Sequence, residues 1–123
     1  MTQIINQIMK KNFSVPDETR PIAKGKIEVL KLEDHQFLRT TFEPGWRWSE
    51  SVKPIAQTDS CMLYHVIYVV SGKIAFRMDD GVTVEFGPGD LGAIPPGHEV
   101  WVVGDAPCVN LDLSGSNNYA RPG

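Results

Sequence analysis

Residues 59–72 read DSCMLYHVIYVVSG and carry the clearest signal of the fold in the chain. Side chains of an extended chain alternate between two faces, so Asp59, Cys61 and His65 share one face, and the alternate residues that follow them are apolar. Residues 66–70 are apolar on both faces, which predicts a strand buried on both sides. Burying a polar group without a partner costs about 1–3 kcal/mol. A carboxylate, a thiol and an imidazole facing inward therefore indicate a polar site.

Turn signals divide the chain on both sides of this stretch. They lie at residues 44–45, 71–72, 79–81, 87–90, 95–97 and 104–107. The short segments between them alternate or are apolar, at residues 26–32, 36–42, 73–78, 82–86, 91–94, 99–103 and 108–113. About eight or nine short strands with turns every 8–12 residues or so, and no long helix, predict an all-β sandwich or barrel.

Composition limits the classes of function. The chain has 123 residues, of which 41% are hydrophobic, enough for one domain with a core. Its net charge is −3 and its basic residues are scattered, unlike the clustered basic face of a nucleic-acid-binding protein. No apolar run reaches the roughly 18 residues of a membrane span, and the first residues lack the order of a signal peptide. We therefore expect a cytoplasmic protein that binds neither nucleic acid nor membrane, with Cys61 and Cys108 reduced.

The pattern also suggests how the chain is divided. Residues 14–25 contain two prolines and little periodicity, and the residues after 113 are polar or glycine-rich. We predict an N-terminal arm or edge segment at residues 1–25, a β-barrel domain at residues 26–113 and a C-terminal tail at residues 114–123.

Most of the chain resembles the cupin superfamily. Residues 87–97 read GPGDLGAIPPG, in which Gly89, Pro95 and Gly97 match the start of the second cupin motif. That motif continues with two residues, a histidine, three residues and an asparagine. Gly72 matches the glycine that closes the first cupin motif. The resemblance implies a small double-stranded β-helix, or jelly-roll barrel, and a homodimer, which is common among cupins of this size.

The metal-binding positions of the cupin motifs carry other residues in this chain. Counting back from Gly72 places His65 in the slot of the glutamate, and Asp59 and Cys61 in the slots of the His-x-His pair. The histidine of the second motif falls on Val100. An insertion of about eight residues also lies within the front of the first motif. None of the usual ligands is present as such.

A different ligand set is available. His98 lies two residues before Val100, so in a strand both side chains point inward. Cys61, His65 and His98 would then converge in the barrel, with Asp59 as a fourth ligand or as a residue that orients a ligand. Thiolate, imidazole and carboxylate groups suit zinc or iron. Each residue also has an ordinary interpretation, such as a buried thiol, a core histidine or a residue of a turn.

Two hypotheses for the function follow. The first is a cupin that binds a small molecule in its barrel, at a zinc or iron ion held by cysteine and histidine. Trp46 and Trp48 would stack on that molecule, although they also suit packing in the core or at the barrel mouth. The alternative is a metal-free ligand-binding or sensing module that acts as a homodimer without catalysis. The sequence leaves open whether the protein is an enzyme.

Overall fold

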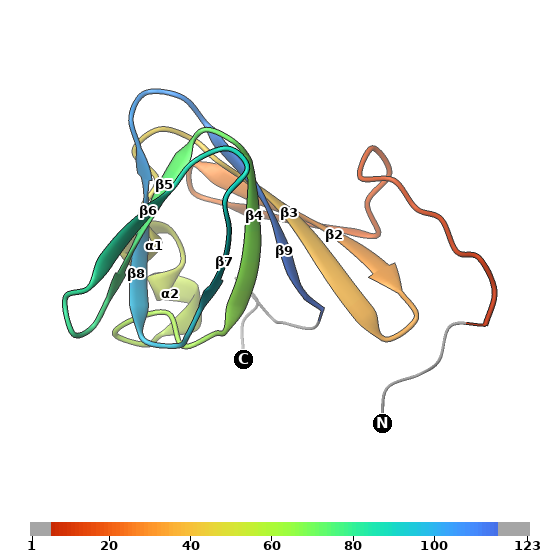
Figure 1. The fold of residues 1–123 in the computed structure, drawn as a ribbon, viewed down its shortest axis with the longest axis horizontal. Helices are drawn as coiled ribbons and strands as arrows, with labels where there is room; N and C mark the ends of the chain where they lie inside the picture. The colour runs from red at the N-terminus through yellow and green to blue at the C-terminus, as the bar shows by residue number, and fades with distance from the viewer. Residues whose placement is uncertain (1–5, 116–123) are drawn as a thin grey trace.

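The computed structural model describes residues 6–115, which fold into an antiparallel barrel of two sheets (Figure 1). The strands are β1 (Glu18–Ile22), β2 (Gly25–Leu32), β3 (His35–Phe42), β4 (His65–Ser71), β5 (Lys73–Met78), β6 (Thr83–Phe86), β7 (Leu91–Ile94), β8 (His98–Val103) and β9 (Cys108–Gly115). The larger sheet has the order β1-β2-β3-β9-β4-β7, and the smaller sheet has the order β6-β5-β8. The prediction of an all-β barrel is confirmed.

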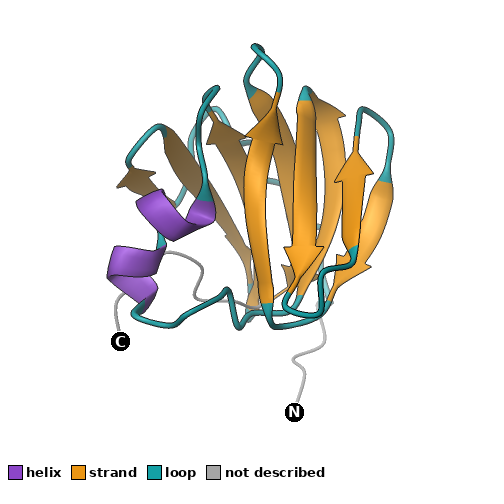
Figure 2. Cartoon of the chain, turned by 90° about the vertical axis from the view of Figure 1, so that its left-hand side faces the viewer, coloured by secondary structure: helices purple, strands orange, loops and turns teal. Residues whose placement is uncertain are grey.

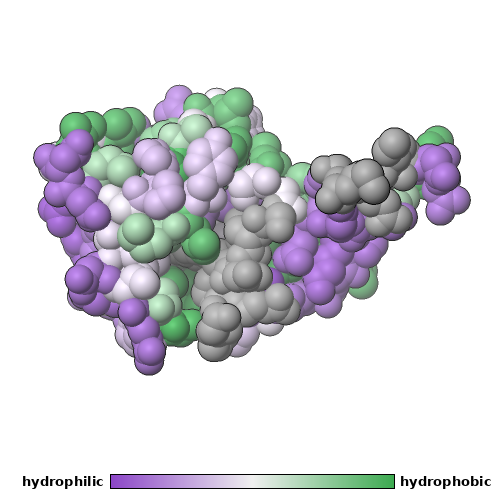
Figure 3. All heavy atoms as spheres, turned by 90° about the horizontal axis from the view of Figure 1, so that it is seen from below, coloured by the Kyte–Doolittle hydropathy of each residue, from purple (hydrophilic) through white to green (hydrophobic). Residues whose placement is uncertain are grey.

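The outer parts of the larger sheet project from the barrel. β1 is an edge strand paired with β2, within the segment that the sequence assigns to an arm or edge. These strands extend to the right of the barrel, where the surface seen from below is mostly hydrophilic (Figures 1 and 3). Charged pairs such as Arg39 with Glu28, at 3.0 Å, lie on this part of the sheet. Because these projecting strands have a hydrophilic surface, the enclosed interior of the fold lies in the barrel and not beside them.

The central strand begins later than the sequence predicts. β4 starts at His65, residues 62–64 are irregular, and Cys61 forms only an isolated bridge to His98. The N–H group of Cys61 donates to the carbonyl of His98 at 2.8 Å, and the carbonyl of Cys61 accepts from Gly97 at 2.7 Å. The prediction of one continuous strand is wrong, because this bridge holds Cys61 against β8 rather than in β4.

Only one face of β4 is buried. His65, Ile67 and Val69 point inward, whereas Tyr68 and Val70 are 38% and 49% exposed. The prediction that both faces are buried is wrong. The smaller sheet covers the inner face of the larger sheet, so the outward side chains of β4 meet solvent.

The tryptophans belong to the core between the two sheets. Trp46 and Trp48 are 0% and 1% exposed, and the ring of Trp46 stacks on Phe42 with centroids 3.8 Å apart. Two short helices follow, α1 (Trp48–Ser51) and α2 (Lys53–Ala56), shown in purple in Figure 2. They occupy the region where the sequence suggests an insertion. No helix within residues 6–115 is long and apolar enough to cross a membrane.

Candidate metal centre

Three side chains with metal-ligating atoms meet where β4 and β8 begin. Sγ of Cys61 lies 3.5 Å from Nε2 of His65, and the ligand atoms of Cys61, His65 and His98 all lie within 4.8 Å of one another. All three residues are buried. Zn–S and Zn–N bonds of about 2.3 and 2.0–2.1 Å in a tetrahedron place sulfur and nitrogen about 3.5 Å apart. The distance from Cys61 to His65 already has that value.

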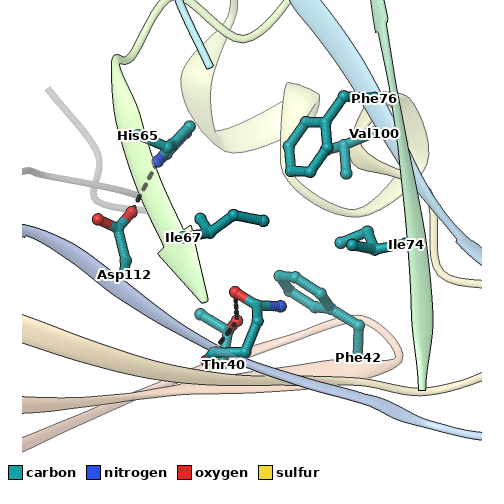
Figure 4. A pocket seen from close by; sticks show the side chains of 9 residues that line it. Thr40, Phe42, His65, Ile67, Ile74, Phe76, Val100 and Asp112 are labelled. Carbon is teal, nitrogen blue, oxygen red and sulfur yellow. Dashed lines mark hydrogen bonds and ion pairs between the residues drawn. The ribbon is translucent and has the colours of Figure 1, made fainter. Parts of the chain in front are cut away.

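Both imidazoles are oriented through their Nδ1 atoms. Nδ1 of His65 lies 2.7 Å from Oδ2 of Asp112 (Figure 4), and Nδ1 of His98 lies 2.8 Å from the carbonyl oxygen of Pro95. A carbonyl can only accept, so Nδ1 of His98 donates, and in the neutral ring Nε2 is then the atom with the lone pair. That Nε2 is buried and has no hydrogen-bond partner among the described residues. Ligating histidines usually have this arrangement, with the second nitrogen bound to a carboxylate or a carbonyl.

Within the cluster, Cys61 favours the negatively charged form and His65 favours the positively charged form. Burial raises the pKa of Cys61, but the hydrogen bond with His65 and the proximity of His98 outweigh it and lower that pKa from 9.0 to about 6. Burial lowers the pKa of His65, but hydrogen bonds with Asp112 and Cys61 outweigh it and raise that pKa from 6.5 to about 9. At neutral pH Cys61 is therefore a thiolate, the form that binds metals.

Asp112 also stays charged despite its burial. Burial raises the pKa of its carboxyl, but His65 and the hydrogen bonds from Ser114 outweigh burial and lower that pKa. Oδ1 accepts from the N–H and Oγ of Ser114 at 3.0 and 2.7 Å, so the two carboxylate oxygens have separate partners. Asp112 thus supplies a fixed negative charge behind the imidazole of His65.

A small cavity of about 30 Å³ lies beside the cluster in the barrel (Figure 4). Its lining consists of Thr40, Phe42, His65, Ile67, Ile74, Phe76, Val100, Asn110 and Asp112. A water molecule needs about 10–15 Å³ of such space, so the cavity has room for water or for the end of a ligand.

Comparisons with known proteins agree with the fold described above. The family model of the EutQ-like cupin domain matches residues 56–108. The chain belongs to the cupin superfamily. Among solved structures, ectoine synthase from P. lautus is similar to this cupin with 11% identity and a TM-score of 0.64, covering 89% of this chain and 80% of that chain.

Further solved cupins have similar folds at low identity. A cupin domain from Bordetella pertussis Tohama I has 18% identity and a TM-score of 0.52, covering 76% of this chain and 94% of that chain. A cupin-like protein from Thermotoga maritima has 19% identity and a TM-score of 0.52, covering 72% of this chain and 65% of that chain. No curated protein matches the sequence. The predicted double-stranded β-helix, or jelly-roll barrel, is confirmed.

The residues singled out in the sequence lie at different places in this cupin. Cys61, His65 and His98 come together, whereas Asp59 lies on an exposed bend and is not part of the group. Trp46 and Trp48 pack in the core and do not line the barrel cavity. Of the two interpretations of Trp46 and Trp48, packing in the core agrees with where their side chains lie.

Asp112 is a site residue that the sequence alone does not predict. It pairs with Ile67 across β4 and β9, which places it on the inner face one step from His65. The alternation of β9 contains a signal for it, because Asn110 and Asp112 share the buried face with Cys108. Two polar side chains on the inner face of a terminal strand indicate that this face reaches a polar site.

Proposed function

We propose that this cupin binds one zinc or ferrous ion through Cys61, His65 and His98 and acts on a small molecule at that ion. The observation that carries the proposal is a pair of imidazoles fixed through Nδ1 beside a thiolate, with ligand atoms of all three residues within 4.8 Å of one another. Three protein ligands leave a fourth position for a water or substrate atom, as in catalytic zinc sites. When bound, such an ion polarises a carbonyl or activates water.

The residues of the chain would have distinct roles around the ion. Asp112 keeps a proton on Nδ1 of His65 and fixes the plane of the ring, so that Nε2 faces the ligand position. The carbonyl of Pro95 does the same for His98. The apolar side chains of Ile67 and Phe76 line the cavity next to the cluster and limit the entry of water.

A second candidate function is metal-free ligand binding or sensing without catalysis. The observation in its favour is an ion pair inside the cluster, because the imidazolium of His65 lies 3.5 Å from the thiolate of Cys61 and 2.7 Å from the carboxylate of Asp112. These contacts hold the three side chains together without a cation. The metal content of the protein separates the two candidates.

The proposal also covers the cellular location, the partners and the assembly of the protein. Cys61 and Cys108 are both free and buried, which supports a cytoplasmic location where thiols stay reduced. We propose a small molecule as the partner of the barrel, a homodimer as the assembly, and no nucleic-acid or membrane partner. Sedimentation of the purified protein tests the assembly directly.

The deciding experiment is the metal content of untagged protein, measured by elemental mass spectrometry before and after reconstitution with zinc or ferrous iron. We expect close to one ion per chain in the parent and loss of that ion in a Cys61→Ala/His65→Ala variant. The matched control is Cys108→Ala/His35→Ala, which removes the same residue types outside the cluster. The control should keep its ion.

Two outcomes would contradict the proposal. Parent protein that holds far less than one ion per chain after reconstitution would favour the metal-free candidate. Equal metal loss in the control variant would show that the ion depends on folding in general rather than on the cluster. Circular dichroism of each variant verifies that it is folded.

A further inference from the structure

A second cavity lies between the two sheets, on the side where they do not join. It has a volume of about 280 Å³ and lies between the edge strands β6 and β7. We refer to it as the β6–β7 groove. Its apolar lining includes Met78, Val82, Val84, Phe86, Ile94 and Pro95. A pocket of roughly 300 Å³ is at the lower end of the range for small-molecule sites.

Strand register places the inner end of this groove beside the metal centre. Met78 is the cross-strand partner of His98, and Ile94 is the cross-strand partner of His65. Pro95, which also lines the groove, provides the carbonyl that orients His98. Two of the three proposed ligands therefore adjoin lining residues of the groove.

A pair of aromatic rings lies between the groove and the barrel interior. Phe76 lines both cavities, and its ring centroid is 5.6 Å from that of His98 and 5.5 Å from that of Phe86. Phe86 lies against the backbone of β7, since a Cβ atom at Gly92 would come within 2.3 Å of its ring. The absence of a side chain at Gly92 thus lets Phe86 bridge the two sheets.

The groove exposes apolar side chains from the inner face of a sheet. Val84 is the cross-strand partner of Phe76 and shares its face, yet it is 52% exposed, and Val82 is 58% exposed. Inward-facing valines would ordinarily be buried between the sheets. A contiguous apolar wall that remains accessible is typical of a ligand site.

The sizes of the two cavities decide how a substrate would fit. The barrel cavity of about 30 Å³ takes only a few atoms, whereas the groove of about 280 Å³ takes a molecule. Among residues 6–115, no charged side chain lines the groove, so its occupant must be apolar along most of its length. A polar end would be directed toward His65 and His98, where a zinc or ferrous ion held by the cluster would bind a carboxylate oxygen directly.

We propose that the β6–β7 groove binds the aliphatic or aryl body of a small molecule whose terminal carboxylate reaches the Cys61, His65 and His98 centre. The polar half of this inference rests on the proposed metal site. The apolar half rests on the groove alone. The substrate class is therefore an amphipathic carboxylate of about the size of octanoate.

The test measures the binding of octanoate and octan-1-ol to zinc-loaded and zinc-free protein by calorimetry. The groove is filled in Val84→Trp, and the matched control is Val70→Trp, at a valine of similar exposure on the outer face of β4. We expect Val84→Trp to weaken both probes at least tenfold and Val70→Trp to leave them unchanged. We also expect zinc to strengthen octanoate at least tenfold and octan-1-ol less than twofold.

Each result supports or overturns a named half of the inference. Equal probe affinity in the two tryptophan variants, or no binding to the parent, overturns the groove. Equal effects of zinc on octanoate and octan-1-ol overturn the contact between carboxylate and metal. If the parent binds no zinc, the proposed function fails, while octan-1-ol still decides the groove. If Val84→Trp does not fold, nuclear Overhauser contacts from octan-1-ol to the methyls of Val84 and Ile94 in the parent support the groove, and their absence overturns it.

Discussion

Replacement of Asp112 by asparagine should weaken metal binding without touching a ligand. The two carboxylate oxygens have different partners, since Oδ1 accepts from Ser114 and Oδ2 faces Nδ1 of His65 at 2.7 Å. Asparagine has one acceptor oxygen and must present its NH₂ group to one of these partners. If the NH₂ group faces His65, Nδ1 becomes an acceptor and the proton moves to Nε2, which can then no longer bind a metal.

The expected magnitude follows from this loss of orientation. Removing a partner that orients a ligand typically lowers metal affinity by about 10–100-fold, which corresponds to about 1.4–2.7 kcal/mol. We expect Asp112→Asn to lie toward the upper end of that range, because one amide cannot accept from both Ser114 and His65 and because the site is buried. The matched control is Asp105→Asn, which makes the same charge change at an exposed turn.

The assay is a competition titration of zinc against a chromophoric chelator at pH 7.5 and pH 9.5. In the parent the pKa of His65 is about 9, so protons compete with zinc at pH 7.5 and no longer do so at pH 9.5. Asp112→Asn removes the charge that raises this pKa, which offsets part of the loss at pH 7.5. The loss of affinity should therefore be greater at pH 9.5.

A folded Asp112→Asn protein that binds zinc within twofold of the parent at both pH values would contradict this role of Asp112. The same role would be contradicted if Asp105→Asn lost as much affinity as Asp112→Asn. Cobalt substitution gives an independent check, because the thiolate-to-metal absorption of the bound ion should persist in Asp105→Asn and weaken in Asp112→Asn at equal cobalt concentration.

Three further predictions concern pH, stability and the backbone. Zinc affinity should rise about tenfold between pH 7 and pH 8, because Cys61, with a pKa of about 6, is already mostly thiolate there while His65, with a pKa of about 9, must release one proton. Chelator titrations across this range measure the slope. The free energy of unfolding of metal-free protein should change little between pH 6.5 and pH 9 through this pair. The lowered pKa of Cys61 favours folding as pH rises and the raised pKa of His65 opposes it, so urea titrations that show a steep slope there would contradict the ion pair. Gly72→Ala should destabilise the fold by more than about 3 kcal/mol, since φ is +76° and a Cβ atom would lie 2.2 Å from the carbonyl oxygen of Pro107. Gly81→Ala, at φ +97° with no atom of the described residues within 4 Å of the new Cβ, should cost only about 1–3 kcal/mol; urea unfolding of the two variants measures the difference.

The strands and turns could be predicted because their signals are local. Alternation and glycine-rich turns fix short segments without reference to the rest of the chain, and β5 and β7 have the predicted bounds. The close approach of Gly72 to Pro107 likewise explains why a glycine closes the first motif. The short helices α1 and α2 carry no periodic signal of useful length, since each has four residues.

The sequence predicts only some of the residues in the candidate metal centre. Cys61, His65 and His98 were predicted together, but Cys61 was expected to lie with His65 on one strand. The structure brings it there through a backbone bridge to His98. Asp59, expected nearby by the same alternation, lies on an exposed bend instead. Period-two reasoning holds only while the strand is continuous, and the strand begins at His65.

The sequence by itself thus determined the barrel, its turns and two inward-facing histidines, because neighbouring residues set backbone conformation and alternation. The place of Asp112 beside His65, 47 residues away, follows from the fold alone, since the pairing of β9 with β4 is a contact between distant segments. The β6–β7 groove was likewise decided by the tertiary structure, because it exists where the edges of two sheets fail to join. Long-range pairing depends on how the whole chain buries its apolar surface, and no local pattern encodes it.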